Sequence, residues 1–423
     1  MNWKWLPVGV VSLLLVACSK SDGDTTRSST TGKDEDRGID AAPRPLAADP
    51  TSWRKTGDLT TARYGHTATL LSDGTVLVVG GENAKRAMMA SVEIFDPQTE
   101  TWRDGPSLPE PRSNHVAVAL VGGKVLVVGG GKNAPIGQPL GEGVTASALL
   151  FDPASGAFSA TGQMHHARSH FRAVRLPSGQ VLVAGGGGDV QESPTDCAGS
   201  PYCGPFGKAQ ASAEIYDPAS GEWSEVASMA TARYSFSMTA LSSGRALVVG
   251  GVNAQAEGFA STELYDPETN TWSNGPPLDS PREHHSATLL GTGRVLVAGG
   301  KNPNVTPLAS VVLFDPATPS WTDTRKLASP RTVPGLVALE SGHALVAGGF
   351  DQLAQVAGKP AYVDEALIYD DTTKGWSTIA PLGTGRLYHS LTLLADGRVL
   401  VVGGLSAEGE LATCEVSEAT ATP

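Results

Sequence analysis

The stretch from Trp272 to Pro316 decides the fold, and it reads WSNGPPLDSPREHHSATLLGTGRVLVAGGKNPNVTPLASVVLFDP. It holds an arginine ten residues after the tryptophan, the run RVLVAGG that ends in two glycines, and the strand-like VVLFDP. The next unit opens at Trp321 with the same marks. Self-similarity at a fixed period indicates modules that bury their faces only against their neighbours.

Four positions of this unit recur seven times in one register. Each unit begins with an aromatic residue: Trp53, Trp102, Phe158, Trp223, Trp272, Trp321 and Trp376. An arginine follows ten residues later: Arg63, Arg112, Arg168, Arg233, Arg282, Arg331 and Arg386. Eleven residues after each arginine comes a glycine, and a Gly-Gly pair begins six residues beyond it. Seven pairs in one spacing form a specific signal, whereas scattered pairs are common.

Short apolar runs such as TVLVVGG and SVEIFDP, bounded by turn residues, predict four antiparallel strands per unit. We name them A (from the arginine), B (ending in Gly-Gly), C (ending near Asp-Pro) and D (around the aromatic residue). Such units are typical of the blades of an all-β propeller. The Gly-Gly pair, the [FY]-D-P turn and the tryptophan resemble the kelch motif from Trp53 to about Ser417, which implies a kelch-type β-propeller.

The two ends of the repeat array predict how the ring closes. In six units the C-strand aspartate precedes the next aromatic residue by six positions, and in the seventh its equivalent is Glu418. The aromatic residue of that unit would fall one position past Pro423, whereas Trp53 has no C strand before it. We therefore expect seven blades, the last completed by the N-terminal strand around Trp53, with no open sheet edge.

Residues 1–17 have the pattern of a targeting segment, with Lys4 before the apolar core Leu6–Val16, which is too short to span a bilayer. The following LVAC resembles the lipobox of bacterial lipoproteins. This resemblance implies cleavage before Cys18 and a diacylglycerol on its thiol. The alternative is an ordinary secretory signal. Ser19 after the cysteine favours the outer membrane.

Residues 18–50 are polar and nearly devoid of residues that could form a core, which predicts a disordered tether before a propeller at 51–423. A net charge of −12 argues against nucleic acid and against an anionic membrane surface as partners. Membrane contact is expected through the lipid anchor only.

The cysteines suit an oxidising, exported location. Cys197 and Cys203 lie close together in the longest insertion, which predicts a disulfide; a reactive or metal-binding pair is the alternative. Cys414, on the last C strand, is expected to be a small buried residue.

The B–C loops differ in length while the A–B turns do not. Gly81 to Glu93 spans twelve residues, and Gly186 to Glu214 spans twenty-eight. Binding residues tend to lie where loops vary on a rigid scaffold. The face that carries the B–C and D–A connections is therefore the candidate working surface.

The start of every A strand, the innermost of a blade, lies on this face and carries the repeat arginine. Four arginines have a histidine three residues on: His66, His115, His285 and His389. A ring of arginines would suit carboxylate, phosphate or acidic sugar groups. The alternative is that each arginine is structural and pairs with a C-strand glutamate. Such glutamates occur in four units only: Glu93, Glu214, Glu263 and Glu415.

The segment RLYHSLTLLADGRV (Arg386–Val399) resembles part of the galactose oxidase and glyoxal oxidase family of copper-radical enzymes. The resemblance implies copper ligands at Tyr388 and His389. That family also needs a Tyr–Cys thioether and a histidine from a C-terminal domain, and no cysteine falls on any predicted A or B strand. We therefore expect no cofactor. His165, His166 and His170 lack a recognisable acidic or thiol co-ligand, so loop residues are favoured over a metal site.

The sequence favours an exported, lipid-anchored and monomeric propeller that binds a protein or polysaccharide at the cell surface without catalysis. One alternative is a carbohydrate-active enzyme, either a sugar mutarotase or a copper-radical oxidase. Another is a structural component of the cell envelope. The fold alone does not choose between them, because one scaffold hosts all three.

Overall fold

The computed structural model describes residues 48–83, 85, 87–131, 143–191, 207–253, 255–302, 306–356 and 359–419. The chain divides into two units, 1–45 and 46–423, and the described residues belong to the second. The targeting segment, Cys18, nearly all of the tether and the pair Cys197 and Cys203 lie outside the described residues. In the described part of the chain, no helix has the length and apolar character needed to cross a membrane.

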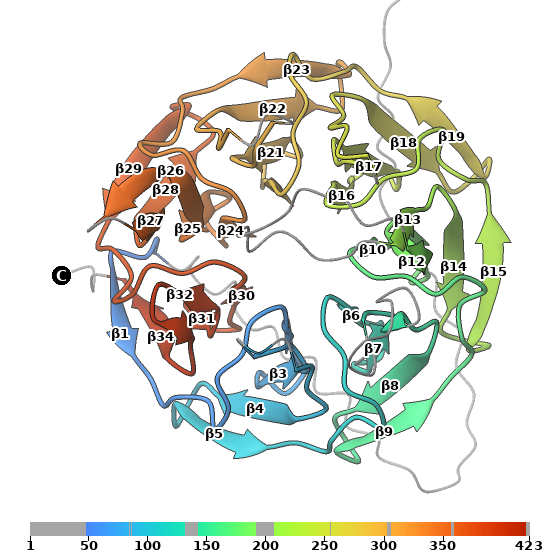
Figure 1. Ribbon diagram of the computed structural model, residues 1–423, viewed down its shortest axis with the longest axis horizontal. Helices are drawn as coiled ribbons and strands as arrows, with labels where there is room; N and C mark the ends of the chain where they lie inside the picture. Colours follow the sequence, from blue (N-terminus) through green and yellow to red (C-terminus); the bar gives the residue numbers. More distant parts are fainter. Residues whose placement is uncertain are drawn as a thin grey trace, which may run out of the picture. The chain divides into compact units, whose positions relative to one another are not determined.

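Seven four-stranded antiparallel sheets stand around a common axis in the second unit (Figure 1). Blade 1 contains β2 (Thr67–Leu70), β3 (Val76–Val79), β4 (Val92–Asp96) and β5 (Thr101–Asp104). Blade 2 contains β6 (Val116–Ala119), β7 (Val125–Val128), β8 (Ala148–Asp152) and β9 (Ala157–Ala160). Blade 3 contains β10 (Arg172–Arg175), β11 (Val181–Ala184), β14 (Ala213–Asp217) and β15 (Glu222–Val226).

The next three blades repeat this order from the inner to the outer strand. Blade 4 contains β16 (Ser237–Ala240), β17 (Ala246–Val249), β18 (Thr262–Asp266) and β19 (Thr271–Asn274). Blade 5 contains β20 (Ser286–Leu289), β21 (Val295–Ala298), β22 (Val311–Asp315) and β23 (Ser320–Asp323). Blade 6 contains β24 (Gly335–Ala338), β25 (Ala344–Ala347), β28 (Ala366–Asp370) and β29 (Gly375–Ile379).

Blade 7 joins the two ends of the propeller. It contains β30 (Ser390–Leu393), β31 (Val399–Val402), β34 (Cys414–Glu418) and the N-terminal β1 (Ser52–Lys55). Trp53 lies opposite Ser417 in the antiparallel pair β1–β34. The all-β fold, the seven blades and the closure by the strand around Trp53 are therefore confirmed.

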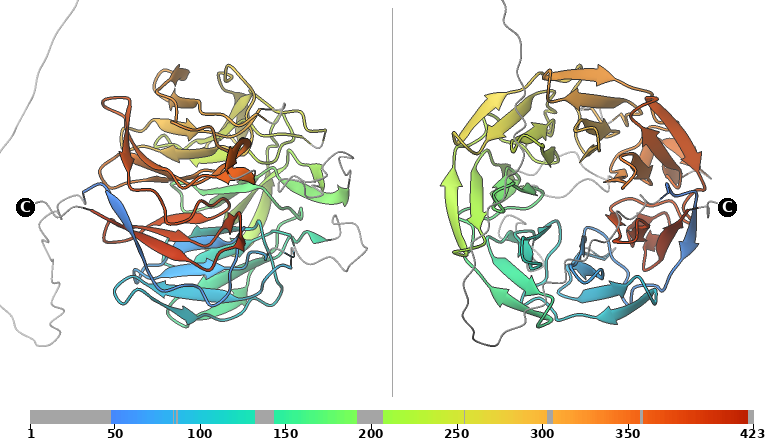
Figure 2. Two further views of the ribbon diagram at one scale, coloured as in Figure 1. Left: turned by 60° about the vertical axis from the view of Figure 1, so that its left-hand side comes forward. Right: turned by 180° about the vertical axis from the view of Figure 1, so that it is seen from behind.

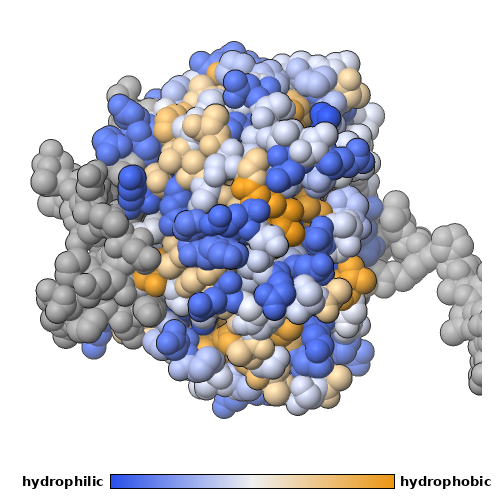
Figure 3. Space-filling view, turned by 90° about the vertical axis from the view of Figure 1, so that its right-hand side faces the viewer, coloured by the Kyte–Doolittle hydropathy of each residue, from blue (hydrophilic) through white to orange (hydrophobic). Residues whose placement is uncertain are grey.

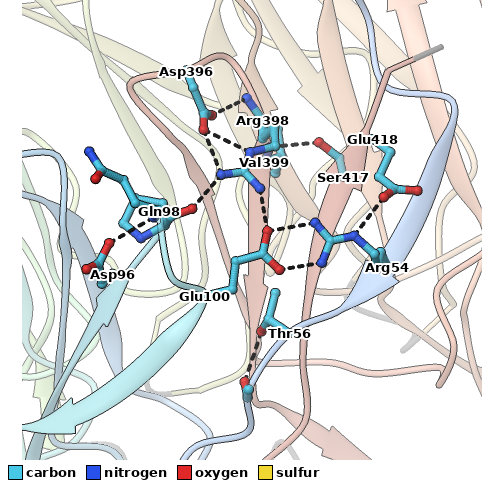
Figure 4. Close-up of polar contacts among 12 residues, drawn as sticks. Arg54, Thr56, Asp96, Gln98, Glu100, Asp396, Arg398, Val399, Ser417 and Glu418 are labelled. Carbon is cyan, nitrogen blue, oxygen red and sulfur yellow. Dashed lines mark hydrogen bonds and ion pairs between the residues drawn. The ribbon is translucent and has the colours of Figure 1, made fainter. Parts of the chain in front are cut away.

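Charged side chains reinforce this closure where blade 7 meets blade 1 (Figure 4). Arg54 on β1 pairs with Glu418 through Nε and Oε1 at 2.7 Å, and its guanidinium also forms a bidentate contact with Glu100. Arg398 Nη1 lies 2.7 Å from Glu100 Oε1. Hydrogen bonds from Arg54 and Arg398 lower the pKa of Glu100 to about 2. Glu100 thus links the first and last parts of the ring.

The hydrophobic core lies between neighbouring blades. Every B strand is fully buried, as in β3, because both of its faces pack against adjacent sheets. The repeat tryptophans add a polar link between blades: Trp272 Nε1 donates to the carbonyl oxygen of Ala227, 2.7 Å away, at the exit of the preceding blade. The rim seen in Figure 3 is largely hydrophilic, with hydrophobic residues in small, separated groups. Burial between modules, rather than within one, therefore holds the ring together.

Candidate functional site

The two ends of the propeller are built differently. On one end the A–B turns are uniform, as where Leu71 N donates to Thr75 O at 2.8 Å and Gly74 takes a positive φ of 85°. The other end, here called the working end, carries the B–C and D–A connections. Its B–C connections contain three additional hairpins: β12 (Gly187–Gln191) with β13 (Gly207–Ala209), β26 (Phe350–Val356) with β27 (Lys359–Tyr362), and β32 (Leu405–Ser406) with β33 (Gly409–Glu410). The β12–β13 hairpin projects beyond the blades in the side view (Figure 2).

The repeat arginine lies beneath the working end and ties together the connections of its own blade. Arg63 is fully buried, and its five N–H groups all find acceptors. These acceptors are the carbonyl oxygens of Thr61, Gly80 and Ser91, the hydroxyl of Ser91 and a carboxylate oxygen of Glu93 at 2.6 Å. Glu93 also accepts from the backbone N–H of Thr60 at 2.7 Å. One guanidinium thus fixes both ends of the B–C connection and the D–A connection.

All seven repeat arginines occupy this buried position, with exposed fractions between 0% and 2%. The carboxylate partner is present in the four blades where the sequence has the C-strand glutamate. A fifth, Arg331, pairs instead with Glu365, which lies before β28 and was not identified from the repeat. Arg112 and Arg282 have no ion pair within the described residues, and burial lowers the pKa of Arg282 to about 10.

The repeat arginines therefore do not form the ligand-binding ring that the sequence suggested. Their guanidinium groups are buried and already hydrogen-bonded within the protein. A sequence signal distinguishes the two kinds of blade. Proline precedes the arginine where the C-strand glutamate is absent, at Pro111, Pro281 and Pro330, and Ala or Gly precedes it elsewhere. The repeat arginine is a structural group whose partner set changes from blade to blade.

Three of the four repeat histidines connect neighbouring blades through a hydroxyl group. His66 Nε2 lies 3.0 Å from Ser390 Oγ, and His285 Nε2 lies 2.8 Å from Ser237 Oγ. His115 Nε2 lies 2.9 Å from Thr67 Oγ1. Each hydroxyl belongs to the first residue of the inner strand in the preceding blade. Burial lowers the pKa of His66 and His115 to about 3, so these rings are neutral at physiological pH.

His389 is the exception, because the matching residue of the preceding blade is Gly335. A Cβ atom added at Gly335 would lie 2.6 Å from His389 Nε2, so the ring occupies the space of the missing side chain. Neither ring nitrogen makes a hydrogen bond of ordinary geometry. Burial lowers the pKa of His389 to about 3, against the opposing effect of the Ala347 and Arg386 backbone.

Tyr388 and His389 do not form a copper site with the residues around them. The Tyr388 ring lies 6.2 Å from that of Tyr64 and packs near Phe350, whereas His389 is directed at Gly335 in the neighbouring blade. Among the described residues, no group of three or more His, Cys, Asp and Glu side chains could hold a metal ion. Cys414 is buried in β34, where burial raises its thiol pKa to about 12, and is not linked to a tyrosine. The donor set thus does not fit a copper-radical centre.

A ring of seven residues, here called the axis ring, surrounds the propeller axis at the working end. Each member lies two positions after a repeat arginine: Gly65, Asn114, His170, Ser235, His284, Val333 and Tyr388. All seven have a left-handed φ between 48° and 63°. Backbone hydrogen bonds link neighbours, as from Asn114 N to Gly65 O at 3.1 Å and from Val333 N to His284 O at 2.8 Å. The backbone is repeated here, but the side chains are not.

Basic side chains gather on one part of this ring, in blades 3 to 5. This basic cluster consists of His170, Arg172, His284 and His285. Burial lowers the pKa of His170 to about 3, and nearby His284 and Arg172 act in the same direction. His284 contacts Ser235 Oγ through Nε2 at 3.2 Å and Glu283 through Nδ1 at 3.3 Å. The Arg172 guanidinium donates to the carbonyl oxygen of Phe171 at 3.0 Å.

Aromatic side chains gather on the opposite arc of the ring, in blades 6, 7 and 1. Tyr64 and Tyr388 face each other in a tilted arrangement, and Phe350 packs edge-on against Tyr362 with ring centroids 5.0 Å apart. Leu353, on the hairpin β26–β27, is 63% exposed. Of these residues, only Tyr388 is predicted as a candidate by the sequence.

The predicted cluster of His165, His166 and His170 does not converge. His165 Nδ1 lies 3.1 Å from Glu214 and His166 Nε2 lies 2.9 Å from Glu225, whereas His170 belongs to the axis ring. These contacts agree with the interpretation as loop residues.

Comparisons with known proteins agree with this geometry. The model of the KLHDC2/KLHL20/DRC7 kelch-repeats domain matches residues 202–404, and that of the kelch motif matches residues 62–109. A comparison with curated protein sequences gives no match. Among solved structures, a fungal alcohol oxidase of the AA5 family in complex with copper is similar, with a TM-score of 0.67 and 13% identity over 88% of this chain and 76% of that chain. At this identity the likeness concerns the fold alone.

Proposed function

Since the chain is a kelch-repeat β-propeller, we propose that it is a non-catalytic binding module that holds a protein or polysaccharide at the bacterial cell surface. Its working end is the binding surface, and a diacylglycerol on Cys18 anchors it to the outer membrane. The observation that carries the proposal is the contrast between the ends: irregular hairpins and varied axis-ring side chains on one, uniform turns on the other. Variation on a rigid scaffold is typical of binding surfaces.

An oxidase activity is the second candidate, because the similar fungal protein is a copper-bound alcohol oxidase. Against it stands the donor set around Tyr388 and His389, in which the histidine is directed at the neighbouring blade. A bound copper ion would supply one-electron chemistry in such an enzyme, but the described residues provide no group of three ligands for it. The binding module is therefore the preferred function.

Two exposed apolar residues on opposite ends provide a matched test of binding. Leu353, 63% exposed, lies on the β26–β27 hairpin of the working end, and Val121, 72% exposed, lies in an A–B turn. We expect immobilised full-length protein to retain a component of cell-envelope extract, Leu353→Asp to lose it, and Val121→Asp to retain it. Equal loss in both variants, or retention in both, would contradict the assignment of the working end.

The anchor is tested separately by cell fractionation. The wild-type chain should sediment with outer membranes and incorporate labelled fatty acid, whereas Cys18→Ser should do neither. A wild-type chain recovered in the soluble fraction without label would contradict lipid anchoring and leave the binding experiment unaffected.

A further inference from the structure

Arg172 departs from the repeat at a position where the other blades carry small or uncharged residues. It is the first residue of inner strand β10. The equivalent residues of the other blades are Thr67, Val116, Ser237, Ser286, Gly335 and Ser390. Departures from an otherwise consistent pattern tend to mark functional positions. A cation here has no counterpart elsewhere in the ring.

No carboxylate neutralises this cation among the described residues. The repeat arginines are held by three to five hydrogen bonds each, whereas within the described part of the chain Arg172 donates one, to the carbonyl oxygen of Phe171. Burial lowers the pKa of Arg172. Arg172 is partly buried, and a cation in such a place without a carboxylate partner among the described residues is suited to bind an anion.

The groups around Arg172 are hydrogen-bonding rather than acidic. His170 and His284 belong to the same arc of the axis ring, and the pKa of His285 is lowered by burial, then by Arg282 and Arg172. Asn114 and Ser235 are the axis-ring neighbours of His170 and His284, and the Ser235 hydroxyl contacts His284 Nε2 at 3.2 Å. Glu283 is the nearby acid, and it already pairs with His284 and Lys301. This set can surround a carboxylate and hydrogen bond to neighbouring hydroxyl groups.

We propose that the basic cluster binds the carboxylate of a uronic acid residue in an acidic polysaccharide, with Arg172 as the charged donor. The proposal rests on the binding function of the working end and names its ligand class. A polysaccharide is favoured over an acidic peptide because Tyr64 and Tyr388, on the opposite arc of the axis ring, offer aromatic contacts to further sugar residues of the same chain. Tyrosine offers an apolar ring with a polar tip, which suits a sugar that has C–H faces and hydroxyl edges.

The test is calorimetric titration of the full-length protein with galacturonate oligosaccharides. The variant is Arg172→Ser, which introduces the residue that blades 4, 5 and 7 carry at this position and is therefore compatible with the fold. Its matched control is Arg175→Gln on the same strand, where the exposed guanidinium donates to Ala119 O at the opposite end. We expect Arg172→Ser to weaken binding about ten- to a hundredfold, as for loss of a charged hydrogen bond, and Arg175→Gln to leave it unchanged.

Two further probes distinguish recognition of a uronic acid from simple charge attraction. Methyl-esterified oligosaccharides keep the sugar but lose the charge, and poly-glutamate keeps the charge but has no sugar. The ester, which removes the negative charge, should bind the wild type as weakly as the acid binds Arg172→Ser. Equal affinity for acid and ester, preference for poly-glutamate, or no binding of galacturonate would overturn this inference. Envelope binding that is lost in Leu353→Asp but kept in Arg172→Ser would also overturn it while leaving the proposed function intact.

Discussion

Two rings of residues lie two positions apart in every blade, and they differ in what the repeat preserves. The first contains the repeat arginine, whose side chain is identical in all seven blades and in each of them donates hydrogen bonds to both ends of the B–C connection. The second is the axis ring, where φ is left-handed in all seven blades but the side chains vary. Where the side chain is repeated, its role is structural; where only the backbone is repeated, the side chains vary, as is typical of binding surfaces.

The largest effect should follow from removing a fully bonded arginine. Arg233→Met would leave the buried carboxylate of Glu263 without its partner, which lies 2.7 Å away, and should lower the free energy of unfolding by about 3–5 kcal/mol. Urea unfolding measures this. Arg282→Met is the control: no ion pair joins Arg282 to another described residue, but it donates to Gly299 O, Ser310 O and Ser310 Oγ, so we expect a smaller loss of about 1–3 kcal/mol. Equal losses would show that the carboxylate is irrelevant to the role of the arginine.

The histidines should show a similar contrast. His285→Phe leaves the buried hydroxyl of Ser237 without its 2.8 Å contact and should cost about 1–3 kcal/mol. His389→Phe removes two buried nitrogens that make no ordinary hydrogen bond, so its stability should stay within about 0.5 kcal/mol of the wild type. Phenylalanine is already present at the equivalent positions Phe171 and Phe236. Thermal unfolding of the two variants measures both losses of stability. A larger loss in His389→Phe than in His285→Phe would contradict the structural role assigned to the His285 contact.

The axis ring can be tested through its one β-branched member. Val333 has a φ of 48°, a conformation that is unfavourable for a β-branched residue. Val333→Asn should raise the free energy of unfolding by about 1 kcal/mol, because asparagine tolerates this backbone better. A fall in stability in the same urea experiment would mean that the Val333 side chain contributes more by packing than its backbone costs.

The smallest effect is expected at the closure of the ring, on a partly exposed ion network. The folded pKa of Glu100 is about 2, below its ordinary value of 4.5, so its contribution is complete above pH 4.5 and is lost as the pH falls towards 2. Glu100→Gln should cost about 1 kcal/mol or less at pH 7 and less again at pH 3. Melting temperatures of the wild type and the variant at pH 7 and pH 3 measure this stability cost. An equal cost at both pH values would show that the cost does not come from the ion network.

The architecture could be predicted from the sequence because spacing alone determines it. The seven arginines, the Gly-Gly pairs and the early Trp53 define blades and closure without knowledge of any contact. The role of the arginines could not be predicted in the same way, since one residue type suits both a buried clamp and an exposed anion site. Pro111, Pro281 and Pro330 mark the blades that lack the C-strand glutamate, but they do not show whether the arginine is buried, and Arg331 after Pro330 still pairs with a carboxylate.

The candidate site was less predictable for a physical reason. Its members share a backbone conformation rather than a residue type, and φ is not visible in a column that contains Gly65, His170 and Tyr388. Arg172 could have been noticed as the one charged residue in a column of small and hydroxyl side chains. That no carboxylate of the described residues pairs with it depends on three-dimensional packing, which the sequence does not show.

We propose that ligand binding takes place on the working end. Hydrogen–deuterium exchange tests this location most directly. The full-length protein would be compared with and without the cell-envelope extract that it retains. We predict slower exchange in the axis ring and in the hairpin β26–β27, with unchanged exchange in the A–B turns such as Leu71–Thr75. Protection confined to the A–B turns, or no protection at the working end while the ligand is bound, would contradict the account.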